Sequence, residues 1–343
     1  MELNQVANDM TDSSGSVLVC TLFDRGYLAS GLAMIESILA TCTCQFLFLV
    51  LALDDDTFKF LVDLDKKEIE PISLSDVMDE PLNQLRHERN WREFCWSLPA
   101  DMLEAVASRN FNFEYVAYVD SDCFFFSDFH QLIDEMGENK SVLIHPHRFP
   151  ETQKHKEFES GTYNVGVILG RKNLYFHQLL LSWKDEVFNE CILDPANGKC
   201  GDQTYLNNWP RTYNFVKVSQ NHGIGAGPWN LESSRYSKDK GHIYLDGDEL
   251  VFYHFSRFKP FFISKYFSLG GAALGYKVSA FVRHAVYRSY LKDYSIASLK
   301  VNYFFKFDSL AKIHLRHFVS AIQQSQMVTY LDFRLRKPGR RIR

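Results

Sequence analysis

The sequence contains no apolar run that approaches the roughly 18 residues of a membrane-spanning helix. Its longest candidate, at 46–53, is far too short. We therefore expect a protein that is soluble or peripheral to a membrane, and not an integral membrane protein.

The cysteines lack the features of a disulfide framework. There are seven, an odd number, several lie within apolar strand-like or helix-like runs, and no secretory signal peptide precedes them. We expect reduced thiols and a cytoplasmic protein. Cys42 and Cys44 are one residue apart, but no second Cys/His pair follows at zinc spacing, so the sequence does not favour a metal site there.

Basic residues are scarce in most of the chain and concentrated at its C-terminal end. The net charge is −4, yet residues 257–343 contain 17 Lys and Arg against 3 Asp and Glu, which leaves −18 on residues 1–256. With 343 residues and 46% hydrophobic content, the chain can bury a core for one large α/β domain and an appendage. We expect a flexible N-terminus at 1–14, a main domain at 15–262, and a basic, aromatic-rich helical region at 263–343.

Continuous apolar runs predict strands, and apolar residues at helical spacing predict helices between them. Strands are predicted at 16–23, 44–53, 69–75, 115–119, 141–146, 163–170, 213–218 and 250–255. Helices are predicted at 27–40, at 54–64 with an aspartate cap, at 82–108 with Pro99 at a helix start, and at 172–191. This alternation predicts an α/β fold with a mostly parallel mixed sheet covered by helices on both faces.

Asp120 and Asp122 follow the strand at 115–119, between apolar residues. Ligands of such sheets bind beyond the carboxyl ends of the strands, and side chains at i and i+2 of an extended segment point the same way. Two carboxylates held in this way repel each other unless a cation or a proton lies between them. The pair therefore predicts a divalent-metal site that holds a diphosphate, since such ions take oxygen ligands. The alternative, a surface turn with two solvated aspartates, is disfavoured by the apolar residues on both sides.

The sequence YVDSD at 118–122 resembles the DxD motif of GT-A glycosyltransferases, which bind nucleotide-sugar donors through a divalent metal. Further segments resemble glycosyltransferase family 8 and its bacterial cell-surface relatives: YNVGVILG (163–170), GDQTYLN (201–207), PWN (228–230) and HFSRFKP (254–260). The resemblance covers about 16–262. It implies a Rossmann-like GT-A domain that transfers a sugar from a nucleotide-diphosphate sugar to a glycan or lipid-linked acceptor, with retention, in cell-surface polysaccharide synthesis.

The resemblance also implies a role for each matching residue. Asp120, Asp122 and His254 would bind Mn²⁺ or Mg²⁺, and Ser121 would be one of the donor-binding residues. Lys259 would contact the donor diphosphate, and the nucleoside would be held by Thr21, Leu22 and Tyr27. Asn164 would border the sugar or acceptor, Asp202 would bind donor-sugar hydroxyls, and Gln203 would lie near the anomeric carbon.

Each of these residues also has a purely structural interpretation. Those considered are a hydrogen-bonded core histidine for His254, a helix cap for Asp202, a core aromatic for Trp229 and a turn residue for Asn164. The sequence also departs from the family pattern. Lys259 follows His254 by five residues where the family commonly has six, and Ser97 stands where the family often has a basic residue, for which Arg86 or Arg92 could substitute.

Two other functions fit parts of the pattern. A haloacid-dehalogenase-type phosphotransferase also uses Asp-x-Asp after a strand, but Phe124 occupies the place of its usual Thr or Val, and three strands precede the motif instead of none. A non-catalytic module that binds nucleotide sugars or glycans is the other alternative, which the full set of donor-side motifs disfavours.

The C-terminal region interleaves basic and aromatic residues. This pattern suits helices that lie on an anionic membrane surface, and we expect 263–343 to dock the protein on the inner face of the cell membrane. A basic aromatic stretch also permits nucleic-acid binding, which we do not expect, or an ordinary helical cap whose aromatics pack on the main domain.

Overall fold

The structure is a computed structural model that describes residues 15–42, 44–109, 112–261, 266–268, 278–305 and 327–329. The N-terminus predicted to be flexible, at 1–14, lies outside the described residues, as does much of the region at 263–343.

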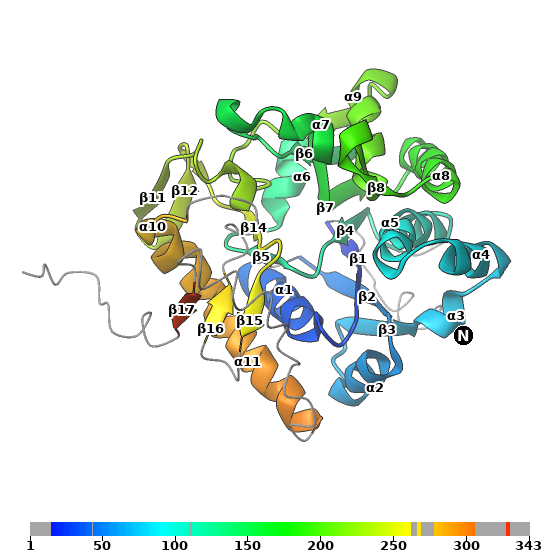
Figure 1. The fold of residues 1–343 in the computed structure, drawn as a ribbon, viewed down its shortest axis with the longest axis horizontal. Helices are drawn as coiled ribbons and strands as arrows, with labels where there is room; N and C mark the ends of the chain where they lie inside the picture. Colours follow the sequence, from blue (N-terminus) through cyan, green and yellow to red (C-terminus); the bar gives the residue numbers. More distant parts are fainter. Residues whose placement is uncertain are drawn as a thin grey trace, which may run out of the picture.

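A seven-stranded mixed sheet forms the centre of the molecule, in the order β10-β6-β7-β4-β1-β2-β3 (Figure 1). Its strands are β1 (Val17–Phe23), β2 (Phe46–Ala52), β3 (Ile69–Ser73), β4 (Tyr115–Val119), β6 (Val142–Pro146), β7 (Tyr163–Arg171) and β10 (Val216–Val218). Strand β7 is antiparallel to both of its neighbours, β4 and β6, and the other pairs are parallel. Because β7 runs against β4, the beginning of β7 lies beside the carboxyl end of β4.

Helices cover both faces of this sheet. Alternate residues of β2 enter two different core clusters, Leu47 and Leu49 on one face and Phe46 and Phe48 on the other. The first face packs on α4 (Glu80–Glu88), α5 (Trp91–Ala107) and α8 (Leu174–Asn189), and the second on α1 (Leu28–Thr41), α2 (Asp55–Leu64) and α6 (His130–Met136). The predicted α/β class, with a mostly parallel mixed sheet between two layers of helices, is confirmed.

The helix predicted at 82–108 is in fact two helices, and Pro99 lies inside α5 instead of at a helix start. The chain leaves α4 at Arg89, and the Asn90 side chain accepts a hydrogen bond from the backbone N–H of Glu93, so α5 begins eight residues before the proline. Proline removes one helical hydrogen bond, and here that loss does not end the helix. The aspartate cap of α2 is confirmed, since Asp54 accepts a hydrogen bond from Thr57 N–H at 2.7 Å.

Short elements complete the described chain. The short helices are α3 (Leu74–Val77), α7 (Lys156–Ser160), α9 (Trp209–Thr212) and the 3₁₀ segments η1 (Glu151–Gln153), η2 (Pro195–Asn197), η3 (Gly201–Asn208) and η4 (Pro228–Asn230). The small sheets are β5 (Cys123–Phe125) with β14 (Phe252–His254), β8 (Leu193–Asp194) with β9 (Lys199–Cys200), β11 (Tyr236–Asp239) with β12 (His242–Leu245) and β13 (Asp248–Glu249), and β15 (Lys259–Phe261) with β16 (Tyr266–Ser268) and β17 (Met327–Thr329).

The C-terminal helical stretch lies alongside α1 (Figure 1). It consists of α10 (Ala280–Val282), a π-helical turn at 283–287 and α11 (Arg288–Phe304). Tyr287 and Tyr290 are fully buried, and the Tyr290 ring stacks on Phe255 with a centroid distance of 3.9 Å. One face of this stretch therefore belongs to the core of the molecule. No helix among the described residues is long and apolar enough to cross a bilayer.

Candidate metal and donor site

The Asp-x-Asp motif lies in the turn between β4 and β5, and backbone hydrogen bonds from two other segments hold it there. Asp120 N–H donates to Gly166 O on β7 at 2.8 Å, and Phe255 N–H donates to Asp122 O at 2.7 Å. Pairing of β5 with β14 sets Cys123 opposite His254. These contacts bring Asp120, Asp122 and His254 together from positions more than 130 residues apart in the sequence.

The three side chains form a group of potential metal ligands whose donor atoms all lie within 4.8 Å of one another. His254 Nε2 is 2.9 Å from Asp122 Oδ1 and 3.7 Å from Asp120 Oδ2. The Tyr118 hydroxyl, two residues earlier on β4, donates to Asp120 Oδ1 at 2.9 Å. His254 is nearly buried, with 8% of its side chain exposed.

Asn164 holds the other side of the His254 ring. Its Oδ1 accepts hydrogen bonds from Gly166 N–H at 2.9 Å and from His254 Nδ1–H at 3.1 Å. Because Nδ1 donates to this oxygen, Nε2 is the ring atom left to face the two aspartates. A second polar contact that fixes the tautomer in this way is a regular feature of histidines that bind metals.

The hydrogen-bonded chain continues from Asn164 to Gln203. The Asn164 amide group donates to Gln203 Oε1 and to His147 Nε2, both at 3.2 Å. Gln203 Nε2 in turn donates to Ser160 O at 2.6 Å. Asn164 is thus bonded directly to His254, and Gln203 is connected to His254 through Asn164.

Steric contacts explain why the Asn-x-Gly-Val segment has a glycine at position 166. A Cβ atom at Gly166 would lie 2.5 Å from both Asn164 Oδ1 and His254 Nδ1, closer than real Cβ contacts come. Only glycine leaves room for the imidazole and the amide to meet over the strand.

The charges of the site shift the pKa values of its members. Burial lowers the pKa of His254, but the negative charges of Asp122 and Asp120 outweigh it and raise that pKa above its usual value. Burial raises the pKa of the Asp120 carboxyl, and it raises the pKa of Asp202 well above the usual range, with a further contribution from the charge of Asp120. The two carboxylates of Asp120 and Asp122, held within 4.8 Å of each other, favour a bound cation.

The donor set itself fits a divalent ion of the Mn²⁺ type. Two carboxylates and one neutral imidazole supply oxygen and nitrogen ligands, and Mn²⁺ accepts both while leaving positions for further oxygens. Proton loss from His254 Nε2 is the change that converts the existing Asp122–His254 ion pair into three metal ligands.

Asp202 and Gln203 are the second and third residues of the 3₁₀ segment η3 (Gly201–Asn208). The N-cap of η3 is Cys200 and no side chain makes a capping hydrogen bond there, so Asp202 is not the helix cap that the sequence allows. The side chain is also buried and close enough to Asp120 for their charges to interact.

The residues predicted to bind the nucleoside lie near the aspartates. In the parallel register Cys20 pairs with Tyr118, so Thr21 and Leu22 come level with the end of β4. Tyr27 caps the N-terminus of α1, and burial, followed by the charges of Asp122, Asp24 and Asp120, raises its pKa to about 12.

Ser121 is buried between the two aspartates. Lys259 begins β15, and its side chain lies outside what the structure describes.

Both arginines that could replace a basic residue at Ser97 lie over tryptophan rings, Arg86 over Trp91 at 4.9 Å from the ring centroid and Arg92 over Trp96 at 5.9 Å. Of the two, only the charge of Arg92 lowers the pKa of Tyr27 and of Cys200.

Sequence reasoning did not assign a role to Tyr118 or His147, and it treated Trp229 as a possible core aromatic. Trp229 is buried and packs edge-on against His254, with a centroid distance of 5.3 Å, and against His147 at 5.0 Å. Burial lowers the pKa of His147 to about 4, which keeps it neutral as an acceptor for Asn164. The sequence signal for His147 was its place directly after the strand at 141–146, the same relation that Asp120 has to its own strand.

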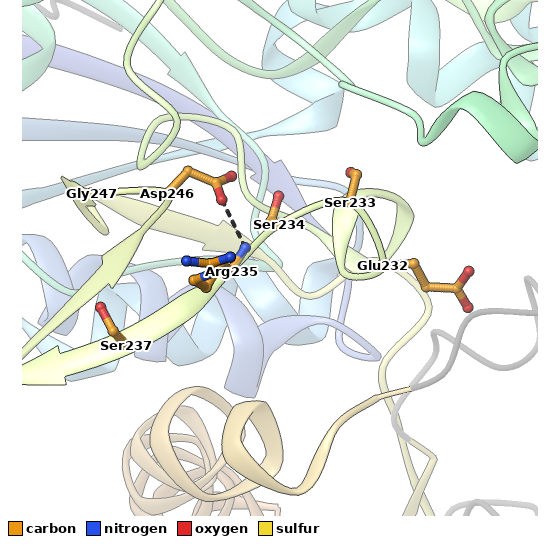
Figure 2. Close-up of a pocket in the computed structure, with 7 residues that line it drawn as sticks. All are labelled: Glu232, Ser233, Ser234, Arg235, Ser237, Asp246 and Gly247. Atoms are coloured by element: carbon orange, nitrogen blue, oxygen red, sulfur yellow. Dashed lines mark hydrogen bonds between the residues drawn. The ribbon is translucent and has the colours of Figure 1, made fainter.

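A separate hollow of about 600 Å³ lies beside β11 and β12 (Figure 2). Its described lining is polar and consists of Glu232, Ser233, Ser234, Arg235, Ser237, Asp246 and Gly247. Arg235 N–H donates to Asp246 Oδ1 at 2.8 Å across it. None of these residues belongs to the group around Asp120.

No family model matches the chain. Among curated proteins, it is similar to the uncharacterized protein YfnF of Bacillus subtilis (strain 168), with 28% identity over 246 residues, which cover 70% of this chain and 81% of YfnF. It is also similar to the uncharacterized protein YfnD of the same strain, with 27% identity over 240 residues, which cover 69% and 76% of the two chains.

Two solved structures that resemble the chain are glycosyltransferases. The galactosyltransferase LgtC, in complex with donor and acceptor sugar analogs, has a TM-score of 0.45 and 16% identity, covering 63% of this chain and 77% of LgtC. Mouse xyloside xylosyltransferase 1 has a TM-score of 0.42 and 13% identity, covering 62% and 87%. At these values the likeness is one of fold and assigns no activity to this chain.

Proposed function

We propose that the chain is a metal-dependent GT-A glycosyltransferase of the family 8 type. It would move a sugar from a nucleotide-diphosphate sugar to a glycan or lipid-linked acceptor, with retention, in cell-surface polysaccharide synthesis. The observation that supports this most directly is the connected chain Asp122–His254–Asn164–Gln203, in which the predicted metal ligands and the predicted sugar-side residues form one hydrogen-bonded unit.

In this proposal Asp120, Asp122 and His254 hold a Mn²⁺ ion, with Mg²⁺ as the weaker alternative. When bound, the ion neutralises the charge that develops on the departing diphosphate, as a Lewis acid does. Asn164 keeps Nε2 of His254 directed toward the aspartates. Tyr118 fixes the Asp120 carboxylate by its hydrogen bond.

The remaining residues orient the donor. Lys259, Ser121 and Arg92 would contact the diphosphate, and Thr21, Leu22 and Tyr27 would hold the nucleoside. Asp202 would accept hydrogen bonds from sugar hydroxyls, and Gln203, held by Asn164 and Ser160, would lie near the anomeric carbon. Interactions at that carbon matter most in the transition state, so they affect kcat more than donor affinity.

A screen of nucleotide-diphosphate sugars tests the proposal. The full chain is incubated with each donor and Mn²⁺, without acceptor, and release of the nucleoside diphosphate is measured together with the thermal shift. We expect hydrolysis of at least one donor that stops in EDTA and returns with Mn²⁺. A chain that neither hydrolyses nor is stabilised by any donor would contradict it, and stabilisation without hydrolysis or transfer would favour the non-catalytic binding module.

We further propose that α11 places this site at an anionic membrane. Its buried stripe, which includes Tyr290 and Tyr294, faces the core, while the opposite stripe is exposed. The exposed stripe begins with Arg288 and Lys292 and continues with Ile296, Leu299 and Tyr303, at helical spacing. Leu299 is 60% exposed and Tyr303 81%. A basic and apolar stripe of this kind suits the headgroup region of an anionic bilayer.

Because α11 contributes to the core, point variants test this better than removal of the helix. Leu299→Glu should reduce co-sedimentation with anionic vesicles, while Leu181→Glu, a matched change at an exposed leucine of α8, should not. Binding of the wild type should weaken as salt rises. Equal binding to neutral vesicles, or none at low salt, would leave α11 as a packing element.

A further inference from the structure

A second group of potential metal ligands lies where the end of α1 meets the start of α6. Cys42 is the C-cap of α1, Cys44 precedes β2, Asp128 lies in the connection from β5 to α6, and His130 is the first residue of α6. The ligand atoms of Cys42, Cys44 and Asp128 all lie within 4.8 Å of one another. Cys44 Sγ is also 3.7 Å from Nδ1 of His130, a residue 86 positions away in sequence.

Core packing holds these two loops against each other. Phe129, between Asp128 and His130, is fully buried and packs edge-on against Phe46 with a centroid distance of 5.3 Å. Phe46 begins β2, two residues after Cys44. The approach of the four polar side chains is therefore set by buried aromatic contacts that do not depend on the polar side chains themselves.

Local hydrogen bonds orient the ligand atoms. Asp128 Oδ1 accepts a hydrogen bond from His130 N–H at 2.8 Å, and Cys42 Sγ accepts one from Cys44 N–H at 3.4 Å. The first bond ties the Asp128 carboxylate to the backbone at the start of α6. The second is favourable for a sulfur that bears negative charge.

We propose that Cys42, Cys44, Asp128 and His130 bind Zn²⁺ as a structural site. Two thiolates, one imidazole and one carboxylate are four ligands of the kinds that zinc takes, and four protein ligands close its tetrahedral shell. With Zn–S near 2.3 Å and Zn–N near 2.0–2.1 Å, the S-to-N edge of that tetrahedron is about 3.6 Å. The Cys44–His130 distance of 3.7 Å matches this edge.

The site differs in chemistry from the group around Asp120, because sulfur ligands select soft or borderline ions and carboxylate-rich sets select hard ones. It does not depend on the proposed transferase function. A bound ion would connect the end of α1 to the start of α6 and stabilise the folded chain by mass action.

Cobalt substitution tests the site with a signal that only thiolates give. The full chain, kept reduced and stripped by a chelator, is titrated with Co²⁺ and its absorption recorded. We expect thiolate-to-cobalt charge-transfer bands that saturate at about one equivalent and disappear when Zn²⁺ is added. Cys42→Ser/Cys44→Ser should abolish the bands, and His130→Ala should weaken Zn²⁺ binding at least about 10-fold.

Two controls separate this signal from other sources. Cys95→Ser removes a half-buried cysteine outside the cluster and should leave the bands unchanged. Asp122→Asn should also leave them, because carboxylates and imidazole give no thiolate band. Circular dichroism checks that each variant is folded. Absence of the bands in the wild type, their persistence in the double serine variant, or formation of a Cys42–Cys44 disulfide in place of metal binding would each overturn the proposal.

Discussion

The two clusters of potential metal ligands differ in what holds them in place. Around Asp120, side-chain hydrogen bonds from Tyr118 and Asn164 support the ligands, and the histidine is only 8% exposed. At Cys44, aromatic packing brings two loops together and the histidine is 47% exposed. If each cluster binds the ion proposed for it, the first would leave coordination positions open for a substrate, whereas the second would supply four protein ligands and no open position.

Burial and ligand type therefore distinguish a proposed substrate-binding metal site from a proposed structural one more clearly than the number of ligands does. If the buried cluster binds a metal, its imidazole must exchange a proton for the ion, so occupancy there would respond to pH and to the donor. In the second cluster the thiols must likewise lose their protons, because the thiolate is the form that binds zinc. Variants that remove ligands from one cluster and leave the other intact therefore test whether the two clusters act independently.

The largest effect is expected from Asp122→Asn. Loss of one carboxylate from the buried cluster should lower donor turnover at least about 100-fold, on the scale of removing one charge-stabilising group from an active site. The cobalt–thiolate bands should be unaffected, and Cys44→Ser should show the reverse pattern. Turnover with Mn²⁺ is the measurement, and Asp63→Asn, at an exposed aspartate of α2, is the matched control. Full activity of Asp122→Asn in EDTA would refute the metal assignment.

Asn164→Ala should have the next largest effect. The variant frees the His254 ring and removes the partner of Gln203 Oε1, and loss of such a supporting contact typically costs about 10- to 100-fold in metal affinity or activity. We expect the Mn²⁺ concentration for half-maximal rate to rise and kcat to fall. Asn197→Ala, at an exposed asparagine, is the control. If the variant changed only the thermal stability, Asn164 would have the structural role of a turn residue, which is the alternative interpretation of the sequence.

The sequence predicted the site residues that are neighbours along the chain, but not the contacts between distant segments. Asp120 and Asp122 were predictable as a pair because they directly follow one strand, but they lie in the turn between β4 and β5, where Cys123 N–H donates to Asp120 O at 3.0 Å, and not in the extended segment that we expected. His254 and Asn164 were found only through resemblance, since their approach depends on the antiparallel placement of β7 and on the β5–β14 pair. The structure brings together all four, but does not test the roles assigned to them.

The sequence could not predict the cluster at Cys44. Its ligands come from two segments 86 residues apart, and the packing of Phe129 on Phe46 that joins them leaves no local periodic signal.

The same limit applies to α11, whose alternation of basic and aromatic residues predicted a helix but not which face is buried. Tyr290 and Tyr303 lie in one helix, yet one is fully buried and the other is 81% exposed.

The pH dependence of the buried cluster should follow the His254 imidazole. Below its raised pKa, His254 carries a proton on Nε2, so Mn²⁺ affinity should fall by up to about 10-fold per pH unit as the pH decreases through that pKa. Without metal, in EDTA, protonation of His254 should instead increase the stability of the folded chain as the pH decreases. Because the folded pKa lies above the unfolded value of about 6.5, His254 contributes stability below that pH, and the contribution is lost as pH rises through the folded pKa.

Thermal unfolding from about pH 5.5 to about pH 9 measures both trends. The EDTA-treated protein should lose melting temperature over the upper part of this range, and Mn²⁺ should restore it most strongly there. His254→Gln should remove both trends, whereas His242→Gln, at an exposed histidine, should keep them. Identical profiles for wild type and His254→Gln would show that another group titrates.

The smallest effect is expected from Tyr118→Phe, which removes only the hydroxyl that donates to Asp120 Oδ1 at 2.9 Å. One hydrogen bond of this kind contributes about 1 kcal/mol, so Mn²⁺ affinity should fall roughly 5-fold while the ring remains packed in the core. Tyr115→Phe, at the opposite end of β4, is the matched control and should leave the affinity unchanged. Cobalt binding at Cys44 should be the same in both variants. A loss of metal affinity of equal size in Tyr115→Phe would mean that the strand, and not the hydroxyl, sets the position of Asp120, and the two clusters would then both rest on packing alone.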